Sequence, residues 1–151
     1  MGITYRKLEE KDLERFISMR IAQLREEGAT EELDLVPALQ DFYHRHMADG
    51  TYVSWLAVDG EKIVGTSGMS FVEKPPYYGC PSGRIGLLSC MYTDPAYRRR
   101  GIAKELLSRV VAEAKAYGCG TVQITVSDMG VLLYADFGFV KNGNFMQYKL
   151  L

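Results

Sequence analysis

Three consecutive arginines and a glycine, Arg98 to Gly101, stand at the start of a helical pattern. Apolar residues recur behind them at three- and four-residue steps through 102–114, which predicts an amphipathic helix. Glycine costs a helix about 1 kcal/mol relative to alanine, and cations oppose the positive end of the helix dipole. The same arrangement suits an anion, because free N–H groups, a missing Cβ and three guanidinium groups converge there. These residues therefore predict phosphate binding.

The elements around this motif place it at the carboxyl end of a strand in a sheet. A largely apolar strand, 84–93, precedes the motif, and another strand, 121–126, follows the helix. A strand, helix, strand crossover predicts that the two strands are parallel neighbours. In open α/β sheets, ligands collect at the carboxyl ends of such strands, where the next helix presents its N-terminus. We expect Gly101 at that point.

The rest of the chain predicts an α/β (α+β) fold with the order β-α-α-β-β-β-α-β-α-β-β. A mixed central sheet of about seven strands is expected, flanked by four helices. The expected elements are 3–8, 10–28, 31–50, 52–58, 63–72, 84–93, 102–118, 121–126, 128–138 and a final pair of strands within 139–151. Asp59-Gly60 and Asn142-Gly143 supply the hairpin turns.

Composition restricts the function classes. The 151 residues predict a single domain, 1–151, and 18 Lys and Arg against 19 Asp and Glu leave a net charge of −1. This charge supplies no general attraction to nucleic acid or anionic membranes, so a nucleic-acid role for the arginine motif is disfavoured. Three cysteines without CxxC spacing argue against disulfides and zinc. With no apolar span or signal-peptide pattern, we expect a cytoplasmic protein without a membrane partner.

Two stretches resemble the GNAT acyltransferase family. The residues from Arg98 to Ala103 fit the signature R/Q-x-x-G-x-G/A, and "LLYADFGFV" at 132–140 is similar to the family's C-terminal motif, in which a tyrosine precedes a Gly-Phe pair. The motifs occur in the family's order, and the likeness spans most of 52–150. The resemblance implies a single GNAT-like domain with a splayed parallel pair formed by 84–93 and 121–126.

The resemblance also implies acetyl-CoA as co-substrate, held in a V-shaped opening between strands that end near Thr93 and Val126. Backbone N–H groups of 99–104 would surround the pyrophosphate, and 91–93 would pair with the pantetheine arm. Ser127 stands where relatives often carry a cofactor-contacting asparagine. The implied cofactor-binding residues are Met91, Tyr92, Thr93, Arg98, Arg99, Arg100, Gly101, Ile102, Ala103, Lys104 and Ser127.

The implied reaction is direct attack of an amine on the thioester in a ternary complex. It needs a deprotonated amine, a donor for the developing oxyanion and an acid for the thiolate. Tyr134 matches the family's acid, since a phenol with a pKa near 10 can protonate a thiolate of similar basicity; the alternative is a tyrosine packed in the core. The backbone N–H of Met91 is the implied oxyanion donor.

The general base is less defined. Many relatives carry a glutamate on the strand matched by 84–93, but this stretch has neither carboxylate nor imidazole. Glu73 is a candidate base that would act through water, and the alternative is that it is an ordinary loop charge. A base is not needed if the amine arrives already deprotonated. Cys90 is better interpreted as a small buried hydrophobe than as a nucleophile. His44 and His46 face different sides of a helix, so we expect no metal site.

We expect the acceptor to meet the first two helices and the 73–83 loop. The acidic stretch 25–34 could attract a cationic amine, or form a solvated turn. The predicted function is N-acetyl transfer to the primary amine of a small molecule or peptide. The alternative is a non-catalytic acyl-CoA-binding sensor or regulatory module. The sequence leaves open whether the protein forms a homodimer.

Overall fold

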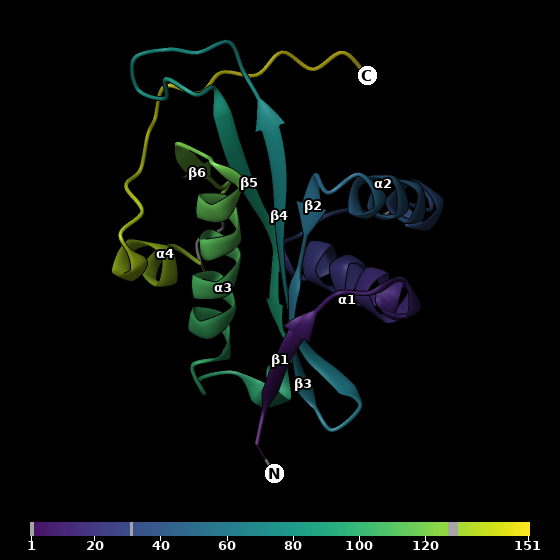
Figure 1. The fold of residues 1–151 in the computed structure, drawn as a ribbon. Helices are drawn as coiled ribbons and strands as arrows, with labels where there is room; N and C mark the ends of the chain where they lie inside the picture. The colour runs from purple at the N-terminus through teal and green to yellow at the C-terminus, as the bar shows by residue number, and fades with distance from the viewer. Residues whose placement is uncertain (1, 31, 127–129) are drawn as a thin grey trace.

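The computed structural model of the protein describes residues 2–30, 32–126 and 130–151. Over these residues the chain forms one mixed sheet of six strands in the order β1-β3-β4-β5-β6, with β2 paired to β4 (Figure 1). The strands are β1 (Thr4–Lys7), β2 (Tyr52–Val53), β3 (Trp55–Asp59), β4 (Lys62–Glu73), β5 (Arg84–Thr93) and β6 (Thr121–Gln123). All neighbouring strands are antiparallel except β5 and β6, which are parallel as the crossover predicts.

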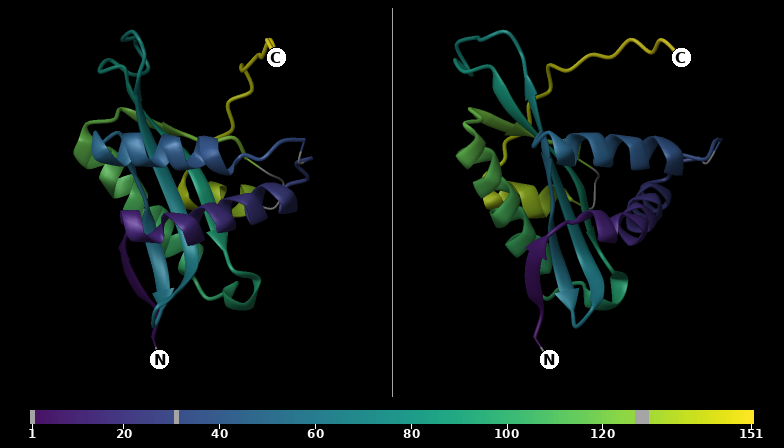
Figure 2. Two further views of the ribbon diagram at one scale, coloured as in Figure 1. Left: turned by 90° about the vertical axis from the view of Figure 1, so that its right-hand side faces the viewer. Right: turned by 45° about the vertical axis from the view of Figure 1, so that its right-hand side comes forward.

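Two layers of helices cover the sheet. Figure 2 shows α1 (Leu13–Glu26) and α2 (Val36–Ala48) on one face, and α3 (Ile102–Tyr117) and α4 (Val131–Phe137) on the other. Short 3₁₀ turns, η1 (Glu10–Asp12) and η2 (Pro95–Tyr97), precede α1 and α3. The helix predicted to run from 102 to near Gly118 or Gly120 is thus confirmed, and of the two glycines it is Gly118 that ends it, with φ 95°, a conformation that favours glycine.

The apolar stripes of α1 and α3 are buried against the sheet. Phe16 and Ile17 of α1 are almost fully buried on one face, and Leu106 and Leu107 of α3 are fully buried on the other. Gly65 of β4 permits the close approach of α3, because a Cβ there would lie 3.0 Å from Cγ2 of Ile102. Burying one such leucine stabilises the fold by about 1.5–3 kcal/mol.

The strand β5 is paired very differently along its two edges. Its β4 edge is paired along its length, from Gly65 opposite Thr93 to Glu73 opposite Arg84. Its β6 edge is paired only where Ile85–Leu87 lie beside Thr121–Gln123. Beyond Leu87 the two parallel strands separate, so the backbone of β5 from 88 to 93 has no β6 partner among the described residues.

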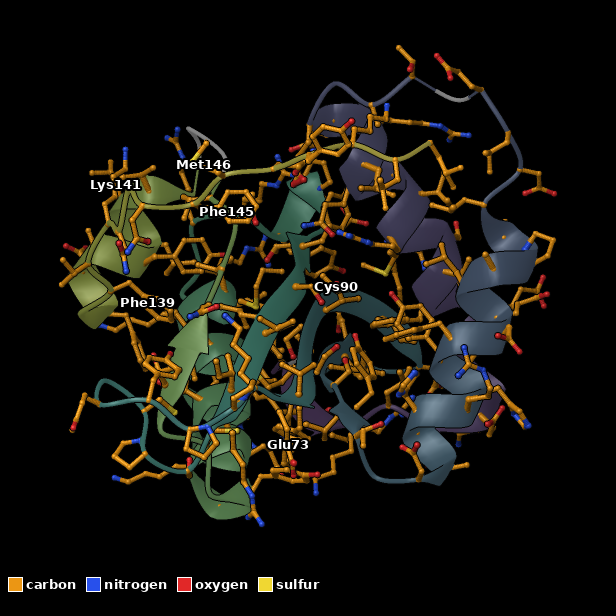
Figure 3. The ribbon with its side chains drawn as sticks, turned by 90° about the horizontal axis from the view of Figure 1, so that it is seen from above. Glu73, Cys90, Phe139, Lys141, Phe145 and Met146 are labelled. Atoms are coloured by element: carbon orange, nitrogen blue, oxygen red, sulfur yellow. The ribbon has the colours of Figure 1, made fainter. Side chains whose placement is uncertain are left out.

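Three strand predictions are wrong in detail. The expected strand 52–58 is divided into β2 and β3, and the strand expected at 121–126 is regular only through Gln123. The final pair of strands in 139–151 is absent from the described structure; because the division of 52–58 adds one strand, the described sheet has six strands in place of about seven. The side chains of Phe145 and Met146, on the segment that follows α4, are 78% and 94% exposed (Figure 3). Alternation and an Asn-Gly turn favour a hairpin locally, but a two-stranded hairpin without a packing surface is only marginally stable.

The helices of the described structure include none that is both long and apolar enough to cross a membrane.

Candidate active site

A β-bulge in β5 lies where the strand has left β6. The pairing register shifts between Thr66 and Gly68, so that Cys90 and Met91 together lie opposite the single residue Ser67. Cys90 has a φ of 57°, in the left-handed region that residues other than glycine rarely adopt. The Oγ1 of Thr66 donates a hydrogen bond of 2.6 Å to the carbonyl oxygen of Cys90. The bulge therefore has a defined backbone orientation.

The two helices on the adjacent face also bond to the bulge. Gln23 of α1 donates from Nε2 to the carbonyl oxygen of Met91 at 3.2 Å. Tyr43 of α2 lies 3.2 Å from the sulfur of Cys90 in a hydrogen bond between hydroxyl and thiol. Burial raises the pKa of Tyr43 well above its ordinary value, so the phenol stays protonated. The Cys90 side chain is 2% exposed and packs with Phe16, as expected for a small buried hydrophobe.

Tyr134 lies on α4, on the face of the sheet that carries α3. Its side chain is buried and its ring packs edge-on against Phe139, with centroids 5.6 Å apart. Burial raises the pKa of Tyr134 to about 12, and the negative charge of Glu27 adds to the shift. The phenol is therefore protonated throughout the neutral range, as a general acid must be, but it is a weaker acid than a free tyrosine.

The expected phosphate site is a loop that leads into α3. Gly101 is the N-cap of α3 rather than a residue of its first turn, with φ 79°, and Arg99 before it also has a positive φ of 63°. The conformation itself thus favours glycine at 101, a reason that helical periodicity does not reveal. Within the described residues no side chain caps this helix start, so first-turn N–H groups remain available to an anion.

The three arginines differ in what they contact. Arg98 donates from Nε to the carbonyl oxygen of Thr93 at 2.9 Å and forms a 2.9 Å ion pair with Glu26. The hydrogen bond to Glu26 raises the pKa of Arg98 further. Arg99 and Arg100 are exposed, and the Arg100 guanidinium lies 5.1 Å from the Tyr97 ring centre. Arg98 therefore joins the end of β5 to the end of α1, whereas the other two side chains face solvent.

The remaining residues predicted to bind the cofactor lie at the end of β5 and in the first turn of α3. The side chains of Met91, Tyr92 and Thr93 are half-buried on the part of β5 that β6 leaves unpaired. Ile102 begins α3 and its side chain is buried in the core with Val64, while Lys104 is exposed. The half-buried Ala103 completes the first turn. Ser127 lies outside the described residues.

Glu73 lies far from the bulge. It is exposed at the last pair of the β4–β5 ladder, opposite Arg84, six residues along β4 from Ser67. At about 3.3 Å per strand residue this is about 20 Å, beyond the reach of a single bridging water. Figure 3 labels both Glu73 and Cys90 and shows them well apart.

The two histidines have local hydrogen-bond partners. His44 Nδ1 lies 2.8 Å from Glu10, and His46 Nδ1 lies 2.6 Å from the hydroxyl of Thr51. Among the described residues no group of three or more His, Cys, Asp and Glu side chains could hold a metal ion.

The residues that hold the bulge were not identified from the sequence. Thr66 and its contact are separated by 24 residues, and Gln23 and its contact by 68. A signal for Thr66 does exist: the small and polar run from Gly65 to Gly68 interrupts an otherwise apolar strand, and its two hydroxyl side chains are buried. Buried hydroxyl groups are usually hydrogen-bonded, so such a run indicates a specific contact.

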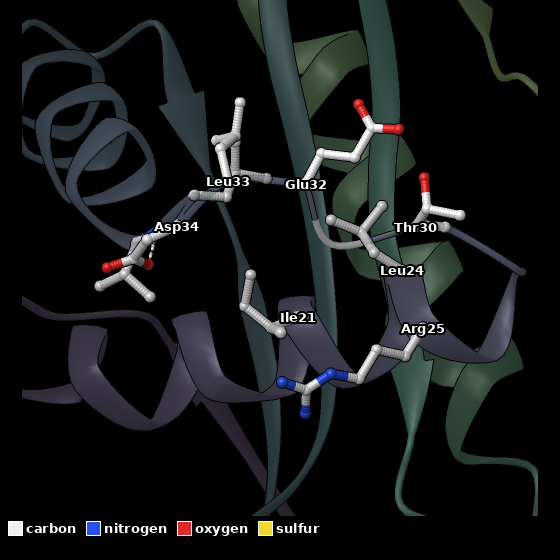
Figure 4. A pocket seen from close by; sticks show the side chains of 10 residues that line it. Ile21, Leu24, Arg25, Thr30, Glu32, Leu33 and Asp34 are labelled. Carbon is white, nitrogen blue, oxygen red and sulfur yellow. Dashed lines mark hydrogen bonds between the residues drawn. The ribbon is translucent and has the colours of Figure 1, made fainter.

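A pocket of about 320 Å³ lies between the C-terminal half of α1 and the connection to α2 (Figure 4). Ile21, Leu24 and Leu33 supply apolar walls, and the carboxylates of Glu32 and Asp34 lie along the rim. The sequence predicts acceptor contacts in this region. Arg25 also lines the pocket, so one cation lies beside the two carboxylates. Apolar walls with an excess of acidic groups suit an amine with an apolar body.

Known proteins resemble this chain in sequence and in fold. The model of the Acetyltransferase (GNAT) family matches residues 13–139. N-acetyltransferase 8B of Rattus norvegicus is 37% identical over 119 residues, which are 71% of this chain and 51% of that protein. N-acetyltransferase 8 of Homo sapiens is 28% identical over 115 residues, 74% of this chain and 49% of that protein. The chain spans about half the length of these curated relatives.

Solved structures match over nearly the whole chain. The crystal structure of a predicted acetyltransferase with acetyl-CoA from Clostridium acetobutylicum has a TM-score of 0.94 and 30% identity, covering 98% of this chain and 96% of that one. A GCN5-related N-acetyltransferase from Ralstonia eutropha JMP134 has a TM-score of 0.86 and 29% identity, covering 98% and 99%. Because the family model covers most of the sequence and these structures share its fold, the chain belongs to the GNAT family of acetyltransferases.

Proposed function

We propose that the protein transfers an acetyl group from acetyl-CoA to a primary amine of a small molecule or peptide. The observation that carries this proposal is the separation of β5 from β6 immediately before the bulge. It leaves backbone groups of β5 free to pair with an extended ligand. The uncapped start of α3 and the buried phenol of Tyr134 lie on the same side of the sheet.

Acetyl-CoA binding is supported by two features of the chain. The first-turn N–H groups of α3 and the exposed side chains of Arg99, Arg100 and Lys104 suit the negative charge of a pyrophosphate. The stretch from Met91 to Thr93 has no β6 partner among the described residues, and that side of the strand suits the amide groups of the pantetheine arm. Arg98 contributes by holding the end of β5 against α1.

The chemistry follows from the groups beside the bulge. The amine nitrogen forms a bond to the thioester carbon and becomes an ammonium, which loses its extra proton to solvent. The carbon–sulfur bond then breaks as the tetrahedral intermediate collapses, and after the thiolate leaves as a thiol the acid recovers its proton from solvent. The N–H of Met91 is the proposed donor to the oxyanion, and Tyr134 is the proposed acid that gives its proton to the departing thiolate. We propose that the acceptor arrives as the free amine, because Glu73 is too distant to deprotonate it.

We place the acceptor on the face covered by α1 and α2. The pocket at the end of α1 carries the carboxylates of Glu32 and Asp34, which favour a cationic body next to the reacting amine. The curated relatives are named N-acetyltransferases, which supports nitrogen as the accepting atom.

A second candidate is an acyl-CoA sensor without catalysis. The observation that favours it is the absence of a carboxylate or imidazole from β5, the strand that borders the opening. A protein that only binds acyl-CoA needs the phosphate loop and the open strand edge but no base.

The two candidates are separated by measuring free thiol release from acetyl-CoA against polyamines, aminoglycosides, amino acids and N-terminal peptides. We expect release with at least one amine class, and mass spectrometry should show one acetyl group on the amine. Calorimetry with acetyl-CoA alone is the companion measurement. Tight binding without turnover on any acceptor would favour the sensor, and no binding would reject both candidates.

A further inference from the structure

We propose that Thr66 is a positioning residue: its hydroxyl holds the peptide between Cys90 and Met91 so that the Met91 N–H faces the opening between β5 and β6. The inference rests on the proposed function, in which that N–H meets the oxyanion. Thr66 touches neither substrate nor reacting atoms in this role. It acts through the carbonyl group of Cys90, to which its Oγ1 donates at 2.6 Å.

Planarity of the peptide transmits the effect. In a trans peptide the C=O and N–H groups point in opposite directions, and the described chain contains no cis peptide bond. The Cys90 carbonyl bonds to a side chain of β4, so the Met91 N–H of the same peptide is directed away from β4. That direction leads to the side of β5 where the pairing with β6 has ended at Leu87.

The bulge requires such a support. Cys90 adopts a φ of 57°, which is strained for a residue with a Cβ and persists only where the surroundings hold it. Thr66 is 2% exposed, so water does not compete for the Cys90 carbonyl, and an unpaired carbonyl at this depth would be costly. Removing the hydroxyl therefore lets the peptide rotate toward a more relaxed conformation.

The neighbouring supports hold other atoms. Gln23 bonds to the next carbonyl, that of Met91, and Tyr43 bonds to the sulfur of Cys90. Neither fixes the plane of the Cys90–Met91 peptide from the β4 side. Among the residues that the structure describes, Thr66 is the one whose side chain bonds to the Cys90 carbonyl.

The test measures the carbonyl stretch of [1-¹³C]acetyl-CoA bound to the protein, by isotope-edited infrared spectroscopy without acceptor. A hydrogen bond to the thioester oxygen lowers this frequency relative to free acetyl-CoA. We expect the lowered band in the wild type and in Thr66→Ser, which keeps the hydroxyl. In Thr66→Val, which keeps the shape but loses the donor, we expect the shift to fall by about half or more.

Calorimetry and thermal unfolding accompany the spectra. We expect acetyl-CoA affinity within about threefold of wild type in both variants, because the phosphate loop is unchanged. Should Thr66→Val not fold, Thr66→Ala removes the same hydroxyl with a smaller side chain. A purely structural threonine would lower the unfolding temperature without moving the band.

The outcomes test the role of Met91 and the role of Thr66 separately. No lowered band in the wild type would overturn the oxyanion role of Met91 in the proposed function. A lowered band that is equal in wild type, Thr66→Val and Thr66→Ala would overturn the role of Thr66 alone. Recovery of the band in Thr66→Ser, with loss in Thr66→Val, supports the inference.

Discussion

The two edges of β5 contrast within one strand. Toward β4 the strand is paired along its whole length, and the bulge there is held by Thr66. Toward β6 it is paired over three residues, Ile85 to Leu87, and then open. The bulge belongs to both edges: it is bonded on the closed edge, and on the open edge the same peptide has no β6 partner among the described residues. A sheet can thus bind a ligand with its backbone when one edge is stabilised strongly enough to leave the other unpaired.

The side chains next to the two edges reinforce this contrast. The closed edge adjoins β4, whose residues include the fully buried Met69. Gln23 of α1 and Tyr43 of α2 form hydrogen bonds to the bulge. On the open side, Tyr134 lies in the hydrophobic cluster against which Met91 packs, and the exposed loop before α3 follows the end of β5. Met69 also belongs to the hydrophobic cluster that contains Tyr134, so the two edges share a core, and the contribution of each edge is testable by perturbing each in turn.

The largest expected effect is on the stability of the closed edge. Met69→Ala removes a fully buried side chain on β4 and should lower the free energy of unfolding by about 2–5 kcal/mol. Leu132→Ala on α4 is the matched control, because Leu132 is 78% exposed and should change that free energy by less than about 0.5 kcal/mol. Urea titration measures both. Equal losses would mean that the buried side chain of Met69 contributes no more to stability than exposed Leu132.

The next effect concerns chemistry at the open edge. Tyr134→Phe should lower kcat by about 100-fold with the amine found in the acceptor screen, because the thiolate loses its proton donor. Packing against Phe139 should be kept, so acetyl-CoA affinity should change little. Steady-state kinetics with calorimetry separates the two quantities. Full turnover in this variant removes Tyr134 from the mechanism.

A smaller effect is expected at the phosphate end. Gly101→Val adds a Cβ where φ is 79° and should weaken acetyl-CoA binding by about 10- to 100-fold, since such strain costs about 1–3 kcal/mol. Gly60→Val is the matched control, because Gly60 has φ 63° and open space but lies in the β3–β4 turn. Calorimetry should show nearly normal affinity in the control. Unchanged affinity in Gly101→Val would refute the phosphate site.

The smallest expected effect is an absence of change with pH. Because burial raises the pKa of Tyr134 to about 12, its acidic form should persist throughout the alkaline range that enzymes tolerate. The kcat/KM profile should then show no loss from tyrosine ionisation below about pH 11, whereas an ordinary phenol would already be half ionised at about pH 10. A fall in kcat/KM near pH 9–10 that disappears in Tyr134→Phe would contradict this assignment.

Much of the architecture could be predicted because its signals are local. The periodicity of α3 and the glycine at 118 predict that helix and its end, and the crossover predicts the parallel pairing of β5 with β6. The hairpin expected in 139–151 has equally good local signals but does not form. Strand pairing depends on a neighbouring edge and a surface to cover, and neither can be read from the segment itself.

The candidate site also has features that the sequence predicts and contacts that only the fold reveals. The glycine and arginines of the phosphate loop are adjacent in sequence, so their combined chemistry is visible there. The same three arginines look equivalent, yet Arg98 is engaged by Thr93 and Glu26 while Arg99 and Arg100 face solvent. Which guanidinium forms the ion pair depends on the end of α1, more than seventy residues away along the chain.

The sequence by itself determined the main helices, the crossover, the glycine and arginines of the proposed phosphate loop and the motifs of the family, because these depend on residues within a few positions of one another. The folded chain decided that β5 carries a bulge, that Thr66 and Gln23 hold it, and that Tyr134 is buried with a raised pKa. Hydrogen bonds and desolvation at these points join segments that are distant in sequence, and their energies exist only once the segments pack together.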